Sequence, residues 1–226
     1  MNPILRTVSF LVLTALIGGT GAARNPDGTL GLIQLPNNGV PVLIRSDGAF
    51  EAVLEKEATL ALSGADGTTA LEVSWSSLPG GLQHGRCKAP GPLSTGVYAL
   101  HAKTASGTDI NTRSVYVVDT FPESYQIAHI TDLHLGRFPE SHPNSGLFQK
   151  IIETVNTSDA VFALITGDVT DNAEPAQFRQ LLEQLDSCRL PTFVVAGNHD
   201  RARNTYQRYF GSSAYTFTFG EDGYLA

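Results

Sequence analysis

The sequence predicts a chain of two parts, an all-β sandwich followed by an α/β region with a parallel sheet. Three observations lead to this prediction. Short alternating segments broken by Gly, Pro, Asp and Asn fill residues 24–120, a texture typical of β-sandwiches. Apolar strands then alternate with helical patterns over residues 121–226, which is the order of a parallel sheet. A polar cluster follows each apolar strand of this second region.

The composition excludes several classes of protein. The chain has 226 residues, of which 42% are hydrophobic and 16% charged, so a disordered or collagen-like chain is excluded. The net charge is −7 and no run of five basic residues occurs; we therefore expect no nucleic-acid partner. Cys87 and Cys188 are too few for a disulfide framework. Two buried small apolar residues are the favoured interpretation, and a disulfide between them is the alternative.

Residues 1–23 have the pattern of a signal peptide. Arg6 precedes an apolar run over residues 8–17, and small residues end the segment at Ala23. The apolar run is shorter than the roughly 20 residues of a membrane span, and no Cys follows it to accept a lipid. A buried first helix is the alternative. We expect a periplasmic or secreted protein with no transmembrane segment after the signal peptide.

The region 24–120 contains six candidate strands. They lie near residues 30–35, 40–45, 59–63, 71–75, 96–104 and 112–118. This spacing predicts an antiparallel sandwich of the immunoglobulin or fibronectin kind. In the fifth strand, alternation places Val97 and Ala99 against a core, with Leu100 as a further candidate. Trp75, the single tryptophan, is expected to be a core residue.

The region 121–226 begins after a boundary at Phe121-Pro122. Strands are predicted over residues 125–131, 160–166 and 192–196. Between them, Leu147, Ile151, Ile152 and Val155 recur at helical spacing, as do Phe178, Leu181, Leu182 and Leu185 in a helix that Pro175 opens. This order predicts parallel strands with right-handed crossovers. Residues 214–219 alternate again, and a turn at 221–223 leads into a last predicted strand.

The three polar clusters suggest a metal site. They are Asp132-Leu133-His134, Gly167-Asp168-Val169-Thr170-Asp171 and Gly197-Asn198-His199-Asp200. The carboxyl ends of parallel strands meet at one edge of a sheet, where ligands bind. Asp132 and His134 are two residues apart, so an extended backbone would aim both to one side. Gly167 and Gly197 permit tight turns.

The types of donor atom narrow the choice of metal ion. Carboxylate, imidazole and amide oxygen without thiolate suit Zn, Mn, Fe or Co. A carboxylate from the middle strand can bridge two ions about 3.5 to 4 Å apart, an arrangement used for in-line attack on phosphorus. Water held between two such ions would be hydroxide near neutral pH.

The motifs D-x-H, G-D-x-x-D and G-N-H-D, in this order, resemble those of the calcineurin-like metallophosphoesterases. The resemblance implies an α/β/β/α metallophosphoesterase sandwich and two divalent metal ions. Asp132 and His134 would bind the first ion, Asp168 would bridge both, and Asn198 would bind the second. His199 would meet the phosphate or protonate the leaving oxygen, and Asp171 would orient it.

The resemblance covers residues 125–226 and departs from the family downstream. Family members carry a further His and then a G-H-x-H pair, but this sequence contains no histidine after His199. We therefore expect an incomplete catalytic domain, weak metal binding and little turnover in this chain, with activity belonging to a longer parent.

The leading hypothesis is an exported phosphoesterase that acts on phosphomonoesters or phosphodiesters through a metal-bound hydroxide. The alternative is a non-catalytic exported binding module with a degenerate phosphoesterase half. Arg137, His142, Arg201 and Arg203 have two open interpretations, as contacts to a substrate phosphate or as ordinary surface residues.

Overall fold

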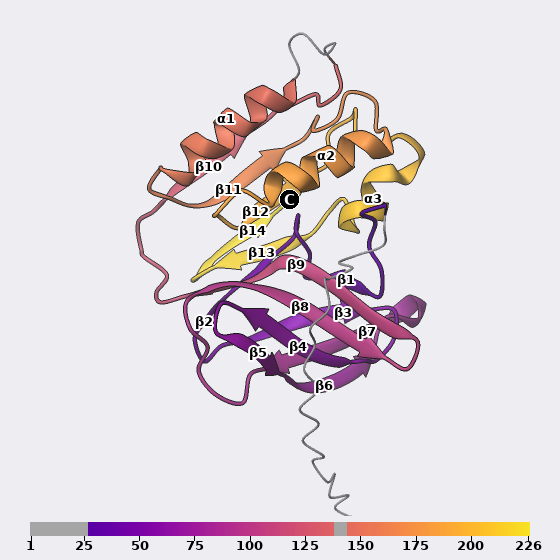
Figure 1. Cartoon of the computed structure of the whole chain (residues 1–226), viewed down its shortest axis with the longest axis vertical. Coiled ribbons are helices and arrows are strands. Elements are labelled where there is room, and N and C mark those ends of the chain that lie inside the picture. Colours follow the sequence, from indigo (N-terminus) through magenta and orange to yellow (C-terminus); the bar gives the residue numbers. More distant parts are fainter. Residues whose placement is uncertain (1–26, 138–143) are drawn as a thin grey trace, which may run out of the picture.

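A computed structural model describes residues 27–137 and 144–226 of the chain. The predicted signal peptide, residues 1–23, lies outside these ranges. Figure 1 shows two parts stacked along the long axis, a β-sandwich below and an α/β part above. Over the two described ranges, no helix combines the length and the apolar character that a membrane span requires.

Nine strands in two sheets form the lower part. They are β1 (Ile33–Leu35), β2 (Val42–Arg45), β3 (Ala49–Leu54), β4 (Thr59–Gly64), β5 (Gly67–Ala70), β6 (Glu72–Ser77), β7 (Gln83–Lys88), β8 (Gly96–Thr104) and β9 (Gly107–Val118). One sheet has the order β1-β3-β7-β6 and the other β2-β9-β8-β4-β5. Side chains of both sheets share one core, for example Phe50 and Leu54 from the first and Leu60, Leu100 and Val115 from the second. Relationship to immunoglobulin or fibronectin domains stays a prediction.

Several details of this sandwich differ from the sequence prediction. Strands β3, β5 and β7 were not predicted, and β2 pairs with β9 in parallel, not antiparallel. In β8 the inward residues are Tyr98, Leu100 and Ala102, whereas Val97 is 40% exposed. The expected inward position of Leu100 is therefore confirmed, whereas that of Val97 was wrong, because successive side chains of a strand point to opposite faces. Cys87 is buried and free, as is Cys188, so the favoured interpretation of the cysteines is confirmed.

The upper part has a parallel sheet with helices on one face. Its elements are β10 (Gln126–Ile130), α1 (Asn144–Asn156), β11 (Ala160–Thr166), α2 (Pro175–Leu185), β12 (Thr192–Val195), α3 (Thr205–Phe210), β13 (Thr216–Phe219) and β14 (Asp222–Leu225). The sheet has the order β10-β11-β12, and both pairings are parallel. The predicted strand–helix order is confirmed, and β13 and β14 form an antiparallel hairpin.

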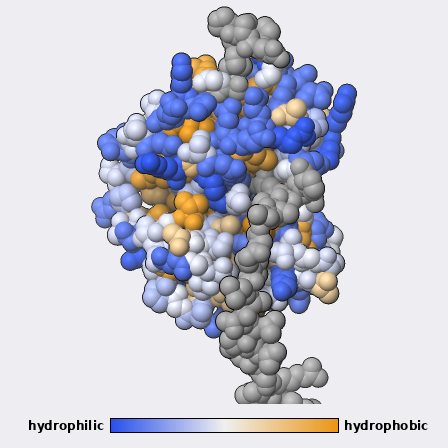
Figure 2. Space-filling view, in the orientation of Figure 1, coloured by the Kyte–Doolittle hydropathy of each residue, from blue (hydrophilic) through white to orange (hydrophobic). Residues whose placement is uncertain are grey.

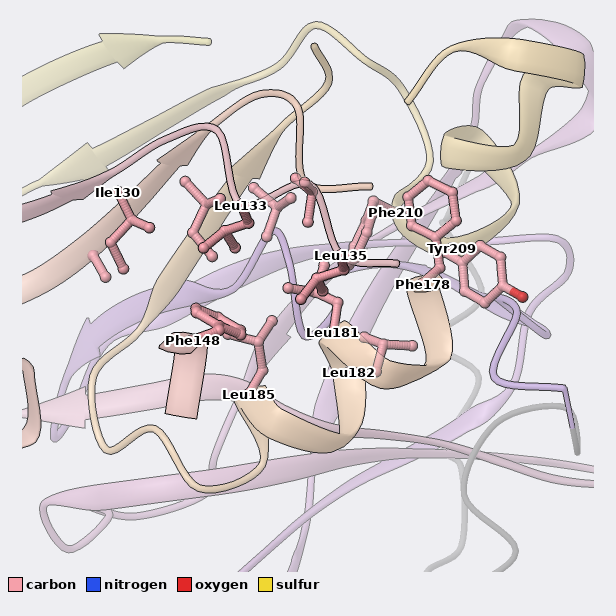
Figure 3. Close-up of a cluster of buried hydrophobic side chains, with 14 of the residues drawn as sticks. Ile130, Leu133, Leu135, Phe148, Phe178, Leu181, Leu182, Leu185, Tyr209 and Phe210 are labelled. Atoms are coloured by element: carbon pink, nitrogen blue, oxygen red, sulfur yellow. The ribbon is translucent and has the colours of Figure 1, made fainter. Parts of the chain in front are cut away.

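The helical face of the sheet encloses the larger core of this part. Phe178, Leu181 and Leu185 of α2 point toward the sheet and toward Leu135 (Figure 3). A capping box between Glu174 and Gln177 fixes the start of α2, with Pro at its first position. Short helices follow β12, namely a 3-10 turn (Ala202–Asn204) and α3, which buries three aromatic side chains, Tyr206, Tyr209 and Phe210.

The opposite face of the sheet packs against the sandwich through an aromatic cluster. This cluster consists of Leu43, Tyr116, Phe162, Phe193, Phe217 and Phe219. The first two residues belong to the sandwich, the next two to the parallel sheet and the last two to β13. The Phe193 and Phe217 rings are stacked with centroids 3.6 Å apart.

Polar bonds join the two parts beside the aromatic cluster. The Arg113 guanidinium donates to the backbone oxygens of Leu185 and Leu190. The backbone N–H of Val194 donates to the Gly39 oxygen over 2.8 Å. The sandwich is thus fixed to the sheet face away from α1 and α2.

On the outside, hydrophilic residues dominate the upper part, and apolar residues form separate patches (Figure 2).

Candidate metal centre

The three polar clusters predicted from the sequence follow the carboxyl ends of β10, β11 and β12. The first two are joined by backbone hydrogen bonds that prolong the parallel pairing. His134 N donates to the oxygen of Asp168 over 2.8 Å, and Leu135 N donates to that of Val169 over 2.9 Å. Asp171 N returns a bond to Leu135 O. The sheet therefore continues into the loops and holds the two clusters in register.

Buried leucines that alternate with the polar residues hold the first cluster in place. Leu133 and Leu135 are buried and point into the helical core (Figure 3). Asp132 and His134 alternate with them, and the backbone there is left-handed, not extended as the sequence suggested, with φ of 55° and 44°. Asp168 has a φ of 48°. Such conformations cost about 1 to 3 kcal/mol each and persist only where surrounding bonds enforce them.

Atoms that could bind a metal ion converge at this edge of the sheet. His134 Nε2 lies 3.8 Å from Asp132 Oδ1 and 4.0 Å from Asp168 Oδ2. Donor atoms of His134, Asp168 and His199 all lie within 4.8 Å of one another. Two atoms that bind one ion at about 2.0 to 2.2 Å lie at most about 4.4 Å apart, a limit that the separations of 3.8 and 4.0 Å from His134 Nε2 satisfy. The donor set and its spacing fit a divalent cation.

The side chains of His134 and Asp132 differ sharply in solvent exposure. The His134 side chain is 13% exposed, whereas that of Asp132 is 63% exposed. The Thr131 hydroxyl donates to Asp132 Oδ2 over 2.7 Å and restricts that side chain. The imidazole of His134 is therefore largely covered by protein, whereas the carboxylate of Asp132 is open to solvent. An ion can reach the site from the side of Asp132.

Asp171 contacts two imidazoles through different atoms. Its backbone oxygen bonds to His199 Nδ1, and its carboxylate Oδ1 lies 3.6 Å from His134 Nδ1. The bond to the Asp171 oxygen is the main cause that raises the pKa of His199; the carboxylates of Asp168 and Asp171 raise it further, and burial opposes them. With Nδ1 engaged, Nε2 of His199 is the nitrogen left for a substrate or a metal.

Other predicted residues lie at the margin of the site. Asn198 is exposed in the loop after β12, and its role as a metal ligand stays a prediction. The positive charge of Arg137 lowers the pKa of His199, which places it within electrostatic reach of that imidazole. Arg201 instead donates to the backbone oxygen of Ala196 over 3.4 Å. His142 lies outside the described residues.

Glycines allow the second and third clusters to touch. A Cβ added to Gly197 would collide with Asp168, and one added to Gly167 would lie 2.9 Å from the Gly197 Cα. Gly167 also has a φ of 90°, a conformation that favours glycine. A side chain at either position would therefore keep the two loops apart.

Asp200 is the residue of this region whose role the sequence did not reveal. Its carboxylate is completely buried and accepts hydrogen bonds from Val169, Thr170 and Gly197. The sequence offered one signal, namely the position of Asp200 directly after Asn198 and His199. Its burial, which is rare for an Asp unless the side chain is paired, became visible only in the structure.

Comparisons with known proteins give a family match for the second part of the chain. Residues 125–224 match the family model described as calcineurin-like phosphoesterase. A probable cyclic nucleotide phosphodiesterase of Moraxella catarrhalis (strain BBH18) is 29% identical over 77 residues, which are 34% of this chain and 28% of that protein. A purple acid phosphatase from yellow lupin (Lupinus luteus) seeds aligns with a TM-score of 0.44 at 13% identity, over 81% of this chain and 43% of that one. The chain thus spans less than half the length of either protein.

Proposed function

Residues 125–224 belong to the calcineurin-like phosphoesterases, and on this premise we propose that the protein is an exported, metal-dependent phosphoesterase acting on phosphomonoesters or phosphodiesters. One observation carries the proposal: carboxylate and imidazole atoms of His134, Asp168 and His199 converge within 4.8 Å. The chain covers 28% of its curated relative, so the activity of the whole protein is part of the proposal.

The proposed centre would take two divalent ions, Mn, Fe, Zn or Co. Asp132 and His134 would hold the first, Asp168 would serve both, and Asn198 would contribute to the second. When bound, the ions would polarise the phosphoryl group and lower the pKa of a water molecule. The largely covered side chain of His134 and the exposed side chain of Asp132 support entry of substrate from the side of Asp132.

The chain's own residues would supply the proton for the leaving group. His199 is the proposed general acid, because the bond from Nδ1 to Asp171 orients the ring and raises its pKa. The protonated form is then more populated near neutral pH, where a proton donor is most useful. Nε2 would hold the proton that passes to the departing alcohol oxygen.

Hydrolysis assays test the proposal directly. The purified protein, freed of metal and then supplied with Mn²⁺, is expected to hydrolyse a chromogenic phosphomonoester or phosphodiester only slowly, because no histidine after His199 completes the metal sites. The longer parent chain is expected to hydrolyse it faster. Asp168→Asn should lower kcat/KM by more than about 100-fold, since even partners behind the ligands account for about 10- to 100-fold. Asp66→Asn is the matched control, because Asp66 is exposed in the turn between β4 and β5.

Two outcomes would contradict this function. Equal rates for Asp168→Asn and the unsubstituted protein would show that the site does not act. A folded, metal-supplied protein that hydrolyses neither ester class, even as the longer parent chain, would favour the non-catalytic binding module instead.

Export is proposed from the pattern of residues 1–23. Cell fractionation should recover the protein in the periplasm or medium, and sequencing its N-terminus should find Arg24 as the first residue. Recovery in the cytoplasm with Met1 retained would refute this part of the proposal.

A further inference from the structure

We propose that Asp200 is a positioning residue that holds Asp168 in its metal-binding orientation without touching the metal. This inference rests on the proposed function for the role of Asp168. Asp200 itself is completely buried, and its two carboxylate oxygens are occupied by protein donors.

The bonds of Asp200 join the loop after β12 to the loop after β11. Oδ1 accepts from the Thr170 N–H over 2.8 Å and from the Thr170 hydroxyl over 2.7 Å. Oδ2 accepts from the Gly197 N–H over 2.9 Å and from the Val169 N–H over 3.1 Å. A carboxylate accepts about four such bonds, so little capacity remains for an ion.

Asp168 makes the reverse connection. It belongs to the loop after β11, and its Oδ1 accepts the backbone N–H of His199 over 3.0 Å. Each loop therefore contributes a carboxylate that binds amides of the other loop. With Oδ1 engaged in this way, Oδ2 is the oxygen that faces His134 Nε2 at 4.0 Å.

The location of these bonds explains why they matter to the site. Asp168 has the left-handed φ of 48°, and Val169 and Thr170, which donate to Asp200, follow it directly. Hydrogen bonds to a charged acceptor are stronger than neutral ones. We infer that the Asp200 carboxylate enforces the strained turn and fixes His199 N, which in turn fixes the rotamer of Asp168.

An isosteric substitution isolates the effect. Asp200→Asn keeps the side-chain volume but replaces one acceptor oxygen by an NH₂ group that faces backbone N–H donors. Mn²⁺ affinity, measured from the free-ion electron paramagnetic resonance signal, should fall about 10- to 100-fold, the range for partners that orient a ligand. Asp168→Asn shows the loss expected when the ligand itself is removed.

Two further measurements separate positioning from general stability. Leu60→Ala, in the core of the sandwich, lowers stability without touching the loops and should leave Mn²⁺ affinity unchanged while the protein is folded. In metal-free protein, the His199 amide should exchange its hydrogen about tenfold faster in Asp200→Asn, a factor that corresponds to about 1.4 kcal/mol. The Ile165 amide, inside β11, should keep its rate.

The outcomes are distinct. Unchanged Mn²⁺ affinity in Asp200→Asn, or an equal loss in Leu60→Ala, would overturn the positioning role. An unchanged His199 exchange rate would overturn the connection through Asp168. If the unsubstituted chain bound no Mn²⁺, the proposed function would fail, and the exchange rates would still decide whether Asp200 holds the two loops together.

Discussion

Asp171 shows how one residue can serve two imidazoles. The family resemblance implied that Asp171 orients His199, and the structure assigns this contact to its backbone oxygen. The carboxylate lies beside His134 instead. A side-chain substitution should therefore affect the metal ligand more than the proposed proton donor.

Asp171→Asn tests this division. We expect about tenfold weaker Mn²⁺ binding, because a carboxylate behind a ligating imidazole raises its basicity. The hydrogen bond to His199 Nδ1 should persist, since the backbone oxygen remains. Titration calorimetry measures the affinity, and ¹⁵N spectra of the His199 ring report the hydrogen-bonded nitrogen. Loss of the Nδ1 signal with unchanged affinity would reverse the assignment.

The cysteines give a prediction at the same scale. Burial raises the pKa of the Cys87 thiol to about 12, and Cys188 is also buried and free. In the native protein at about pH 8, near the ordinary thiol pKa, a colorimetric thiol reagent should react slowly. Two thiols per chain should react at once in denaturant. Fast labelling of the native protein would show that these residues are accessible.

The residue types of the sequence predicted which polar clusters lie together, but they did not predict the hydrogen bonds between the loops. Three polar clusters, each behind an apolar strand, identified Asp132, His134, Asp168 and His199 because strand ends of a parallel sheet must meet. The role of Asp200 and the use of the Asp171 backbone depend on which loop amides face which carboxylate. Only the folded turns determine that.

The helices separate what periodicity predicts from what it misses. In α2, all four expected residues, Phe178, Leu181, Leu182 and Leu185, are buried. In α1 the expected residue Leu147 is 60% exposed, and Phe148 is completely buried in its place. A run of adjacent apolar residues fits two faces of a helix, and packing against the sheet selects one.

Neighbouring substitutions in α1 test this assignment. Phe148→Ala should destabilise the protein by about 3 to 5 kcal/mol, the usual range for a buried Phe. Leu147→Ala should change stability by less than about 0.5 kcal/mol, as exposed positions do. Urea unfolding followed by circular dichroism measures both. A larger effect at Leu147 would place the other face of α1 against the sheet.

Some elements have weak local signals. Strand β7 (Gln83–Lys88) is mostly polar and turns only Gly85 and Cys87 inward, so alternation was not visible. Helix α3 contains Tyr206, Tyr209 and Phe210, and aromatic residues are not strong helix formers. Both elements form because tertiary packing covers their apolar side.

The association of the two parts is a property of the whole molecule. The sequence indicated a boundary near Phe121-Pro122, and β9 ends at Val118 while β10 starts at Gln126; the limits 24–120 and 121–226 stay predictions. The shared aromatic cluster was not predicted. Its members are far apart in sequence and become neighbours only when the sandwich covers the sheet.

This interface predicts unfolding in a single step. Trp75, the only tryptophan, lies in β6 of the sandwich, whereas the α-helices lie in the other part. Tryptophan fluorescence and far-ultraviolet circular dichroism should therefore report the two parts separately. Their urea transitions should coincide, as in a cooperative unit.

Arg113→Gln probes the same interface. The substitution leaves the Leu185 and Leu190 oxygens without their guanidinium donor, which should destabilise the protein by about 1 to 3 kcal/mol. Urea titration with both probes measures the loss, and Arg86→Gln, at an exposed position of β7, is the control. Separate transitions in the unsubstituted protein would contradict the predicted coupling.

The left-handed turns at Asp132, His134 and Asp168 have a consequence for laboratory evolution. If variants were selected for heat resistance with no demand for activity, these positions would be released from the need to bind anything. Glycine tolerates such backbone conformations better than any other residue. We expect glycine to accumulate at these three positions, so that the sites of early drift would mark out the proposed metal centre without any assay of its chemistry.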